Sequence, residues 1–340
     1  MINMIKKNTF AQITLCCCVS LAVISTSQVI AAPNTSATIS FSSILEQERQ
    51  WAGLQSKTLK VEDITWRYSE GGSNSKPTII LIHGLSGSRD NWNRVAHYLT
   101  PYYHVIIPDL PFHGETQVPS EFDSSVPNLT EKLRRFAEAG NFAKNTHIAG
   151  HSLGGAIAML YGAQYFSDTK SLLLMNSAGV YRQANTPYLK DPTLLRDLIV
   201  KKPGDLKGLL KLAMGNPPFI PQEIEKQQEA LMMSQSQNSM KVIDQLNVVF
   251  KAYTPESFAL AGRIIDAPTL IMWGDQDRII NHEVSQELKS ILKFAESPII
   301  YKGIGHMPLL ELDQVVAKDY LNFLQKVSSN ATKSAQVESP

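Results

Sequence analysis

A serine between glycines is the residue with the clearest chemical potential in this sequence. It lies in Gly150-His151-Ser152-Leu153-Gly154, which follows a short apolar run and precedes a helix-forming stretch. A sharp strand-to-helix turn of this G-x-S-x-G type exposes the serine hydroxyl, and the first N–H groups of the following helix can hold an oxyanion. A glycine-rich junction with Ser152 as helix N-cap fits the same residues, so the motif alone leaves both interpretations open.

Three further polar motifs follow apolar runs elsewhere in the chain. A histidine–glycine pair occupies 83–84, two aspartates lie at 275 and 277, and His306 comes near the end. Open α/β sheets bind ligands at the carboxyl ends of their parallel strands, so we expect these side chains to meet Ser152 there. Together they supply a nucleophile, a carboxylate and a base, which is the equipment for acyl transfer.

Two aspartates compete for the role of acid. Asp275 directly follows a glycine and is placed to bond the backbone of its own turn. Asp277 lies two residues further on, where the loop can reach across to the loop that carries His306. We therefore expect Asp277 to accept a hydrogen bond from Nδ1 of His306, which leaves Nε2 to face Ser152.

Alternating strands and helices must position these residues. Short, continuous apolar runs suit strands that are covered on both faces. The expected strands span residues 59–68, 78–82, 105–109, 146–150, 171–175, 269–273 and 298–301. Helices are expected over residues 42–54, 89–99, 128–139, 152–166, 284–292 and 315–327. The pattern predicts an α/β fold with a mostly parallel central sheet flanked by helices.

A helical insertion, residues 181–264, interrupts the strand rhythm and is called the cap here. Its helical patterns cover residues 194–200, 206–214, 223–234 and 240–250, separated by prolines. The predicted division is a signal peptide at 1–31, an N-terminal lead and helix at 32–58, core parts at 59–180 and 265–328 around the cap, and a disordered tail at 329–340. Placed over the site, the cap would supply an acyl pocket, with Phe219 and Met233 as our candidates.

The first residues of the chain predict export. Two lysines precede an apolar run at 13–24, which is too short to span a bilayer comfortably, and cleavage after Ala31 would follow small residues. Cys16, Cys17 and Cys18 all lie in this segment, so the mature chain would contain no cysteine. We expect a periplasmic or secreted protein. An uncleaved anchor and a lipid on Cys18 are the alternatives.

The composition argues against several classes of protein. The chain has 340 residues, 43% hydrophobic and 19% charged, which is enough for a sizeable core. Lys and Arg number 32 against 31 Asp and Glu, and no segment is strongly basic, so nucleic acid is not an expected partner. The sequence has no glycine-rich nucleotide motif and no metal-ligand spacing, so we expect neither cofactor nor metal.

The motifs resemble the α/β-hydrolase superfamily over residues 60–328, and within it the capped bacterial triacylglycerol lipases and esterases. The similar segments are His83-Gly84-x-x-Gly87, Asp90-Asn91-Trp92, Ile107-Pro108-Asp109, Gly150–Gly155, Asn176-Ser177-Ala178-Gly179, Pro217–Pro221, Trp273–Asp277 and Gly305–Pro308. The resemblance implies Ser152 as nucleophile, Asp277 as acid and His306 as base. It also implies an oxyanion hole and a lining for the site, from the N–H groups of Leu85 and Leu153 and from His83, Gly84 and His151 respectively.

Two departures from that family weaken a substrate assignment by analogy. The loop Phe112-His113-Gly114-Glu115-Thr116 replaces a common Gly-x-Gly-x-Ser, and His151 stands where close relatives often carry Asn. The resemblance implies hydrolysis of a carboxylic ester, as a lipase or esterase acting on a small acyl ester or lipid. A monomer with transient contact to a membrane or lipid surface is expected.

Two other functions stay open. A carbon–carbon bond hydrolase acting on a dienoic keto acid would use the same triad, although export disfavours it because such catabolism is usually cytoplasmic. A ligand-binding receptor built on a hydrolase scaffold would keep the triad while turnover is incidental. Chromogenic esters of several acyl lengths would separate the three functions.

Overall fold

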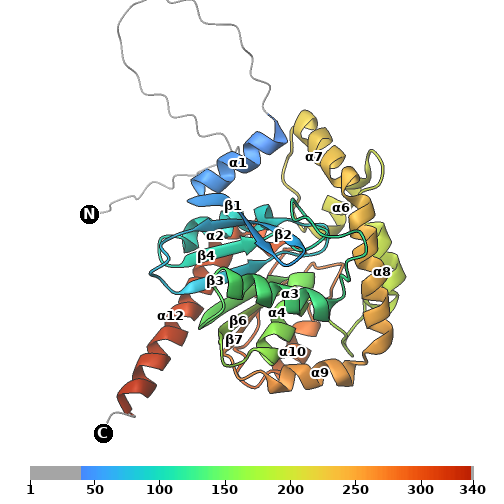
Figure 1. Cartoon of the computed structure of the whole chain (residues 1–340). Helices are drawn as coiled ribbons and strands as arrows, with labels where there is room; N and C mark the ends of the chain where they lie inside the picture. The colour runs from blue at the N-terminus through green and yellow to red at the C-terminus, as the bar shows by residue number, and fades with distance from the viewer. Residues whose placement is uncertain (1–39, 338–340) are drawn as a thin grey trace, which may run out of the picture. The chain divides into compact units, whose positions relative to one another are not determined.

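An eight-stranded sheet organises residues 40–337, the part of the chain that this computed structural model describes (Figure 1). The strand order is β1-β2-β4-β3-β5-β6-β7-β8. The strands are β1 (Leu54–Val61), β2 (Ile64–Gly71), β3 (Thr78–Ile82), β4 (His104–Pro108), β5 (Thr146–His151), β6 (Thr169–Met175), β7 (Thr269–Gly274) and β8 (Ile299–Tyr301). Only the pairs β1·β2 and β2·β4 are antiparallel, so the predicted mostly parallel sheet is confirmed.

The prediction of one strand at 59–68 is wrong, because β1 and β2 form a hairpin there. Val61 pairs with Ile64, and Glu62 in the turn has a φ of 55°. Two-residue hairpin turns favour Asn-Gly or Asp-Gly, whereas this one is Glu62-Asp63. The usual turn signal is therefore missing from the sequence.

Helices cover both faces of the sheet. Ile79 and Leu81 of β3 pack in one apolar cluster with residues of α2 and α12, while Ile80 and Ile82 pack in a second with residues of α3 and α4. A strand buried on both faces reads as a continuous apolar run, which is why these strands could be predicted. The core helices are α1 (Phe41–Trp51), α2 (Asn93–Leu99), α3 (Val126–Ala139), α4 (Leu153–Gln164), α10 (Val284–Ile291), α11 (Pro308–Glu311) and α12 (Asp313–Val337), with a 3₁₀ turn η1 (Arg89–Trp92).

Between β6 and β7 the chain forms a series of helices. They are α5 (Pro187–Lys190), η2 (Pro192–Leu198), α6 (Asp205–Ala213), α7 (Gln222–Ser234), α8 (Ser236–Ala252) and α9 (Pro255–Ile264). Figure 1 draws α6, α7 and α8 to one side of the sheet. Helix α9 was not among the predicted helices, although Thr254 and Ser257 form a capping box at its start. This helix packs against α4 and α10, both of which belong to the core.

The C-terminal end of the chain differs from the prediction, whereas the predicted N-terminal segment cannot be compared with the structure. We predicted that the last helix ends at Val327 and that a disordered tail follows, whereas α12 continues to Val337. The predicted signal peptide at 1–31 lies outside the described residues. Within residues 40–337, no helix combines the length and apolar character needed to cross a bilayer.

Candidate active site

Ser152 sits on a strained turn between β5 and α4. Its φ of 53° and ψ of −119° are unusual for a residue with a side chain, and such strain concentrates at functional sites. The flanking glycines permit the turn, because a Cβ at Gly150 would lie 2.0 Å from the carbonyl oxygen of Gly154. The turn leaves the Ser152 side chain half-buried at the carboxyl end of β5, beside the first N–H groups of α4.

His306 and Asp277 meet at the carboxyl ends of neighbouring strands β8 and β7. His306 Nδ1 lies 2.8 Å from Asp277 Oδ2, and both residues are buried. The second carboxylate oxygen, Oδ1, accepts from the backbone N–H groups of Ile279 and Ile280, each at 2.9 Å. A carboxylate can only accept, so Nδ1 of His306 carries the proton and Nε2 is left available as a base.

Asp275 takes a different role from the one its position suggested. Its Oδ1 accepts from the N–H of Gly303 at 2.7 Å, so it joins the β7 loop to the β8 loop instead of bonding its own turn. Asp277, by contrast, bonds both its own loop and His306. The structure thus brings Asp277 to the histidine and leaves Asp275 as a brace between the two loops.

His151 links the serine turn to the histidine loop. Its Nε2 donates to the carbonyl oxygen of His306 at 2.7 Å, and the two imidazole rings lie 4.9 Å apart. Burial lowers the pKa of His151 to about 3, so its ring is neutral at ordinary pH. Because His151 directly precedes Ser152, this bond holds the nucleophile candidate and the base candidate at one end of the sheet.

The loop after β3 lies against Ser152. A Cβ at Gly84 would come within 2.9 Å of the Ser152 Cβ, so only glycine fits without a shift. The N–H of Leu85 has no hydrogen-bond acceptor among residues 40–337, and the N–H of Leu153 opens α4, where helices lack intrahelical acceptors. His83 braces this loop from beneath: its Nδ1 donates to the Gly84 carbonyl oxygen at 2.8 Å.

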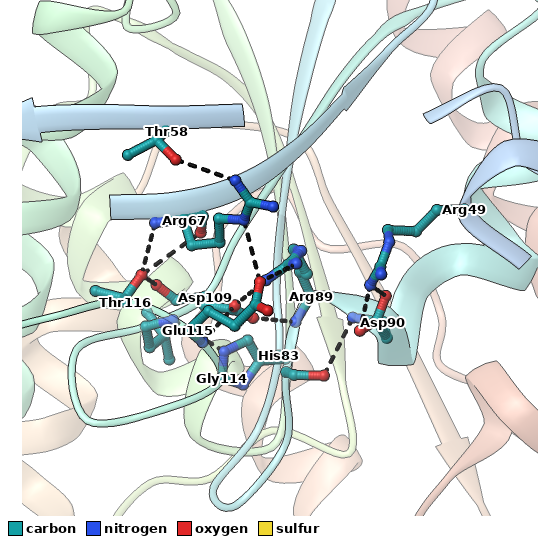
Figure 2. A network of polar contacts seen from close by, with 12 residues as sticks. Arg49, Thr58, Arg67, His83, Arg89, Asp90, Asp109, Gly114, Glu115 and Thr116 are labelled. Carbon is teal, nitrogen blue, oxygen red and sulfur yellow. Dashed lines mark hydrogen bonds and ion pairs between the residues drawn. The ribbon is translucent and has the colours of Figure 1, made fainter. Parts of the chain in front are cut away.

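A buried ion pair fixes the far end of the same loop (Figure 2). The Arg89 guanidinium donates to Asp109 and Glu115, and the Arg89 N–H also donates to Asp109 at 2.6 Å. Asp109 is fully buried and Arg89 is 2% exposed. Glu115 and Thr116 belong to the loop that departs from the family pattern, and Thr116 Oγ1 donates to the Asp109 carbonyl oxygen. In this chain, Glu115 and Thr116 of that loop therefore hold it against Arg89 and Asp109.

The cap residues proposed for the acyl pocket fall in two different environments. Met233 is half-buried on α7. Phe219 is 85% exposed, in the loop between α6 and α7, so in this structure its ring faces solvent and its part in an acyl pocket stays a prediction. Proline residues on both sides (Pro217, Pro218 and Pro221) restrict the backbone of that loop.

Three residues near the site have contacts that the sequence did not predict, although Asn176 belongs to one of the family-like segments. Asn176, at the end of β6, donates to Asp277 Oδ2 at 2.7 Å. Ser86, next to Leu85, has a φ of 56° and bonds Ser239 of α8 at 3.0 Å, which joins the loop to the cap. A polar residue directly after an apolar strand was a usable signal for Asn176. Nothing in the sequence pairs Ser86 with Ser239. Among residues 40–337, no three His, Cys, Asp or Glu side chains gather as metal ligands would.

Known proteins share this fold and part of this sequence. A family model described as alpha/beta hydrolase fold matches residues 77–312. Lipase 1 of Psychrobacter immobilis is 31% identical over 297 residues, which cover 86% of this chain and 91% of that protein. The crystal structure of a candidate lipase from Acinetobacter baumannii AYE is 61% identical with a TM-score of 0.86, covering 88% of this chain and 100% of that one. A bacterial membrane phospholipase A is 31% identical with a TM-score of 0.79, covering 85% and 91%. The chain belongs to the α/β-hydrolase family.

Proposed function

We propose that this carboxylic ester hydrolase works through Ser152, His306 and Asp277 and forms an acyl-enzyme. The observation that carries the proposal is the 2.8 Å contact between His306 Nδ1 and Asp277 Oδ2, at the same sheet end as a serine with a φ of 53°. A histidine bonded in this way is fixed in the tautomer whose Nε2 can accept a proton.

The chemistry follows from these groups. Nε2 of His306 takes the Ser152 proton while Oγ attacks the ester carbonyl, and the N–H groups of Leu85 and Leu153 stabilise the oxyanion. His306 then gives the proton to the leaving alcohol, which departs as the acyl-enzyme forms. A water molecule, deprotonated by His306, attacks the acyl-enzyme, and Ser152 regains its proton as the acid is released.

A lipid ester is the substrate class that the relatives favour. Lipase 1 of Psychrobacter immobilis and the bacterial phospholipase A are both named as enzymes that cleave lipid esters. The cap, which touches the loop after β3 through Ser86 and Ser239, is placed to choose among acyl chains. The half-buried Met233 is the residue we expect to limit chain length.

Ester turnover with a serine variant tests the function. Ser152→Ala should lose roughly 10⁴–10⁶ in kcat on p-nitrophenyl esters and keep its fold. A fluorophosphonate should label the wild type once, at Ser152, and leave the variant unlabelled. Full activity or full labelling of the variant would remove the proposal. Binding of acyl ligands without turnover would favour a receptor, and cleavage of dienoic keto acids alone would favour a carbon–carbon hydrolase.

A lipid surface is the partner we propose for the outer face of α6. Lys201 and Lys202 precede this helix, and Lys207 and Lys211 are one turn apart on it, all four exposed. None of the four ammonium groups forms an ion pair within residues 40–337, although the Asp205 carboxylate at the start of α6 lies near Lys201 and Lys202. The exposed Phe219 follows on the next loop. A basic face with an aromatic tip suits an anionic lipid surface, since both attraction and insertion contribute.

Export remains a proposal of the same kind. The two lysines, the apolar run at 13–24 and the small residues before Ala32 support cleavage after Ala31. N-terminal sequencing of the protein recovered outside the cytoplasm should begin near Ala32. A lipid on Cys18, or a chain that keeps residues 1–31, would contradict this.

A further inference from the structure

Asn176 is a buried amide that contacts the acid of the proposed triad. It directly follows β6, its side chain is fully buried, and its φ is 45°. Its Nδ2 lies 2.7 Å from Asp277 Oδ2 and 3.4 Å from the carbonyl oxygen of Gly305. Its Oδ1 is buried and has no partner in the described part of the chain. A strained backbone and an unpaired buried oxygen are unfavourable for stability, so the residue needs a reason to be there.

The chemistry of its neighbours fixes which way the amide points. A carboxylate and a backbone carbonyl are both acceptors, so only the NH₂ end of Asn176 can face them. The same oxygen, Asp277 Oδ2, therefore receives one proton from Asn176 and one from His306. With Ile279 and Ile280 on Oδ1, the carboxylate has four donors.

We propose that Asn176 is a positioning residue that sets the pH range of the proposed triad. It does so by donating a hydrogen bond to Asp277 Oδ2, the same oxygen that His306 contacts. Its N–H withdraws negative charge from Asp277 Oδ2, so the carboxylate stabilises a protonated His306 less strongly than it would alone. Less stabilisation keeps His306 in its neutral, base-competent form to lower pH. The inference rests on the proposed function, because it needs His306 to be the base.

The other titratable groups near His306 are neutral or are hydrogen-bonded to backbone N–H groups. His151 faces it from β5 and stays neutral, since burial lowers its pKa to about 3. Glu311 of α11 accepts from Gly305 N and Gly215 N, which fixes the histidine loop. The Asp275 carboxylate accepts a hydrogen bond from the N–H of Gly303. Asp277 is thus the anion in hydrogen-bond contact with the imidazole, and Asn176 is the side-chain amide that modulates it.

The pH profile of kcat/KM on a soluble ester tests the proposal. Asn176→Ala removes the donor, so the acidic limb should move to higher pH by roughly half a unit to one unit, which is about three- to tenfold less activity on that limb. Asn176→Asp keeps the shape but adds a carboxylate, and it should move the limb further in the same direction. Asn176→Ser is the milder variant to use if the others fold poorly.

Asn93 provides a matched control. It is also fully buried, donates to an aspartate (Asp90, 3.0 Å) and has an unpaired Oδ1, but it lies on α2. Asn93→Ala should lower stability and leave the pH midpoint in place. An unchanged midpoint in folded Asn176 variants, or a uniform loss of kcat at every pH, overturns the inference. Activity of Ser152→Ala would instead overturn the proposed function, so the two failures are distinguishable.

Discussion

At the scale of single residues, Asp275 and Asp277 lie two positions apart but have different partners, because Asp275 accepts from Gly303 N–H and Asp277 contacts His306. Asp277→Asn keeps the shape but forces an amide against His306 Nδ1, so the histidine loses the tautomer that frees Nε2. We expect a loss of about 10⁴ in kcat, the size of the effect in known serine triads. Asp275→Asn should lose far less, because Gly303 N–H can still donate to its side-chain oxygen.

Steady-state kinetics at the pH optimum, on protein shown to be folded by circular dichroism, decides between the two aspartates. The reverse ranking would move the role of acid to Asp275. Comparable losses in both variants would mean that the loops, and not one carboxylate, limit the reaction.

The nucleophile, acid and base candidates could be predicted because each follows a buried strand and carries a residue type suited to acyl transfer. Asn176 follows a strand too, but its partner lies 101 residues away, and an amide by itself indicates no chemistry. The Ser86–Ser239 contact is less visible still, since serines are common and their pairing depends on how α8 docks. The exposure of Phe219 could not be predicted, because apolar character alone does not say whether a loop residue faces the protein or the solvent.

At the scale of elements, the Arg89–Asp109 pair locks the loop after β3 to the loop after β4. Arg89→Met would leave Asp109 buried without its partner, which should lower the free energy of unfolding by about 3–5 kcal/mol. Glu115→Gln is the matched control. Its side chain is 62% exposed, so the change should be about 0–1 kcal/mol.

Urea denaturation of both variants measures this difference. An Arg89→Met protein within 1 kcal/mol of the wild type would mean that the pair adds nothing beyond an apolar filling. We also expect lower kcat in Arg89→Met, because the loop that carries Leu85 loses its anchor.

Helices and strands could be predicted where their burial produces a clear pattern of apolar residues in the sequence. The strands β3 to β7 are largely buried on both faces, and β8 is a short apolar strand at the sheet edge, so apolar runs and flanking turns located them. The β1–β2 hairpin alternates polar and apolar residues across a turn without glycine, which hid the break. Helix α9 was missed because its exposed Leu260 and Ile264 blur the apolar face that packs on the core.

At the scale of the whole molecule, four buried histidines make stability depend on pH. Burial is the main cause that lowers the pKa of His83 to about 4 and those of His113, His147 and His151 to about 3. The unfolded chain binds these protons near pH 6.5, whereas the folded chain does not. Their contribution is therefore complete above pH 6.5 and is lost as the pH falls below it, by up to about 1.4 kcal/mol per histidine per pH unit.

Denaturant unfolding at pH 7.5, 6 and 5 should show this loss. His147 lies away from Ser152, at the start of β5, with Nδ1 against Ser171 Oγ. His147→Gln should be less stable than the wild type at pH 7.5 but should lose less stability on acidification. A slope that is the same with and without His147 would mean that the ring is protonated in the folded state.

Contact with a lipid surface would involve the molecule as a whole, because it orients the site toward its substrate. The C-terminal end of α6 reaches the site directly, since the Ala213 carbonyl oxygen accepts from the backbone N–H of His306 at 2.6 Å.

Lys207→Glu/Lys211→Glu, in a Ser152→Ala background, should weaken binding to phosphatidylglycerol vesicles by at least about 30-fold, given roughly 1 kcal/mol per lysine. Lys60→Glu/Lys144→Glu makes the same charge change at exposed positions on β1 and before β5, and should have a much smaller effect. Phe219→Ser should weaken binding to anionic and neutral vesicles alike, because it removes insertion and not charge. If both lysine pairs lowered vesicle binding equally, the attraction would depend only on the net charge of the protein, and α6 would not be the docking face.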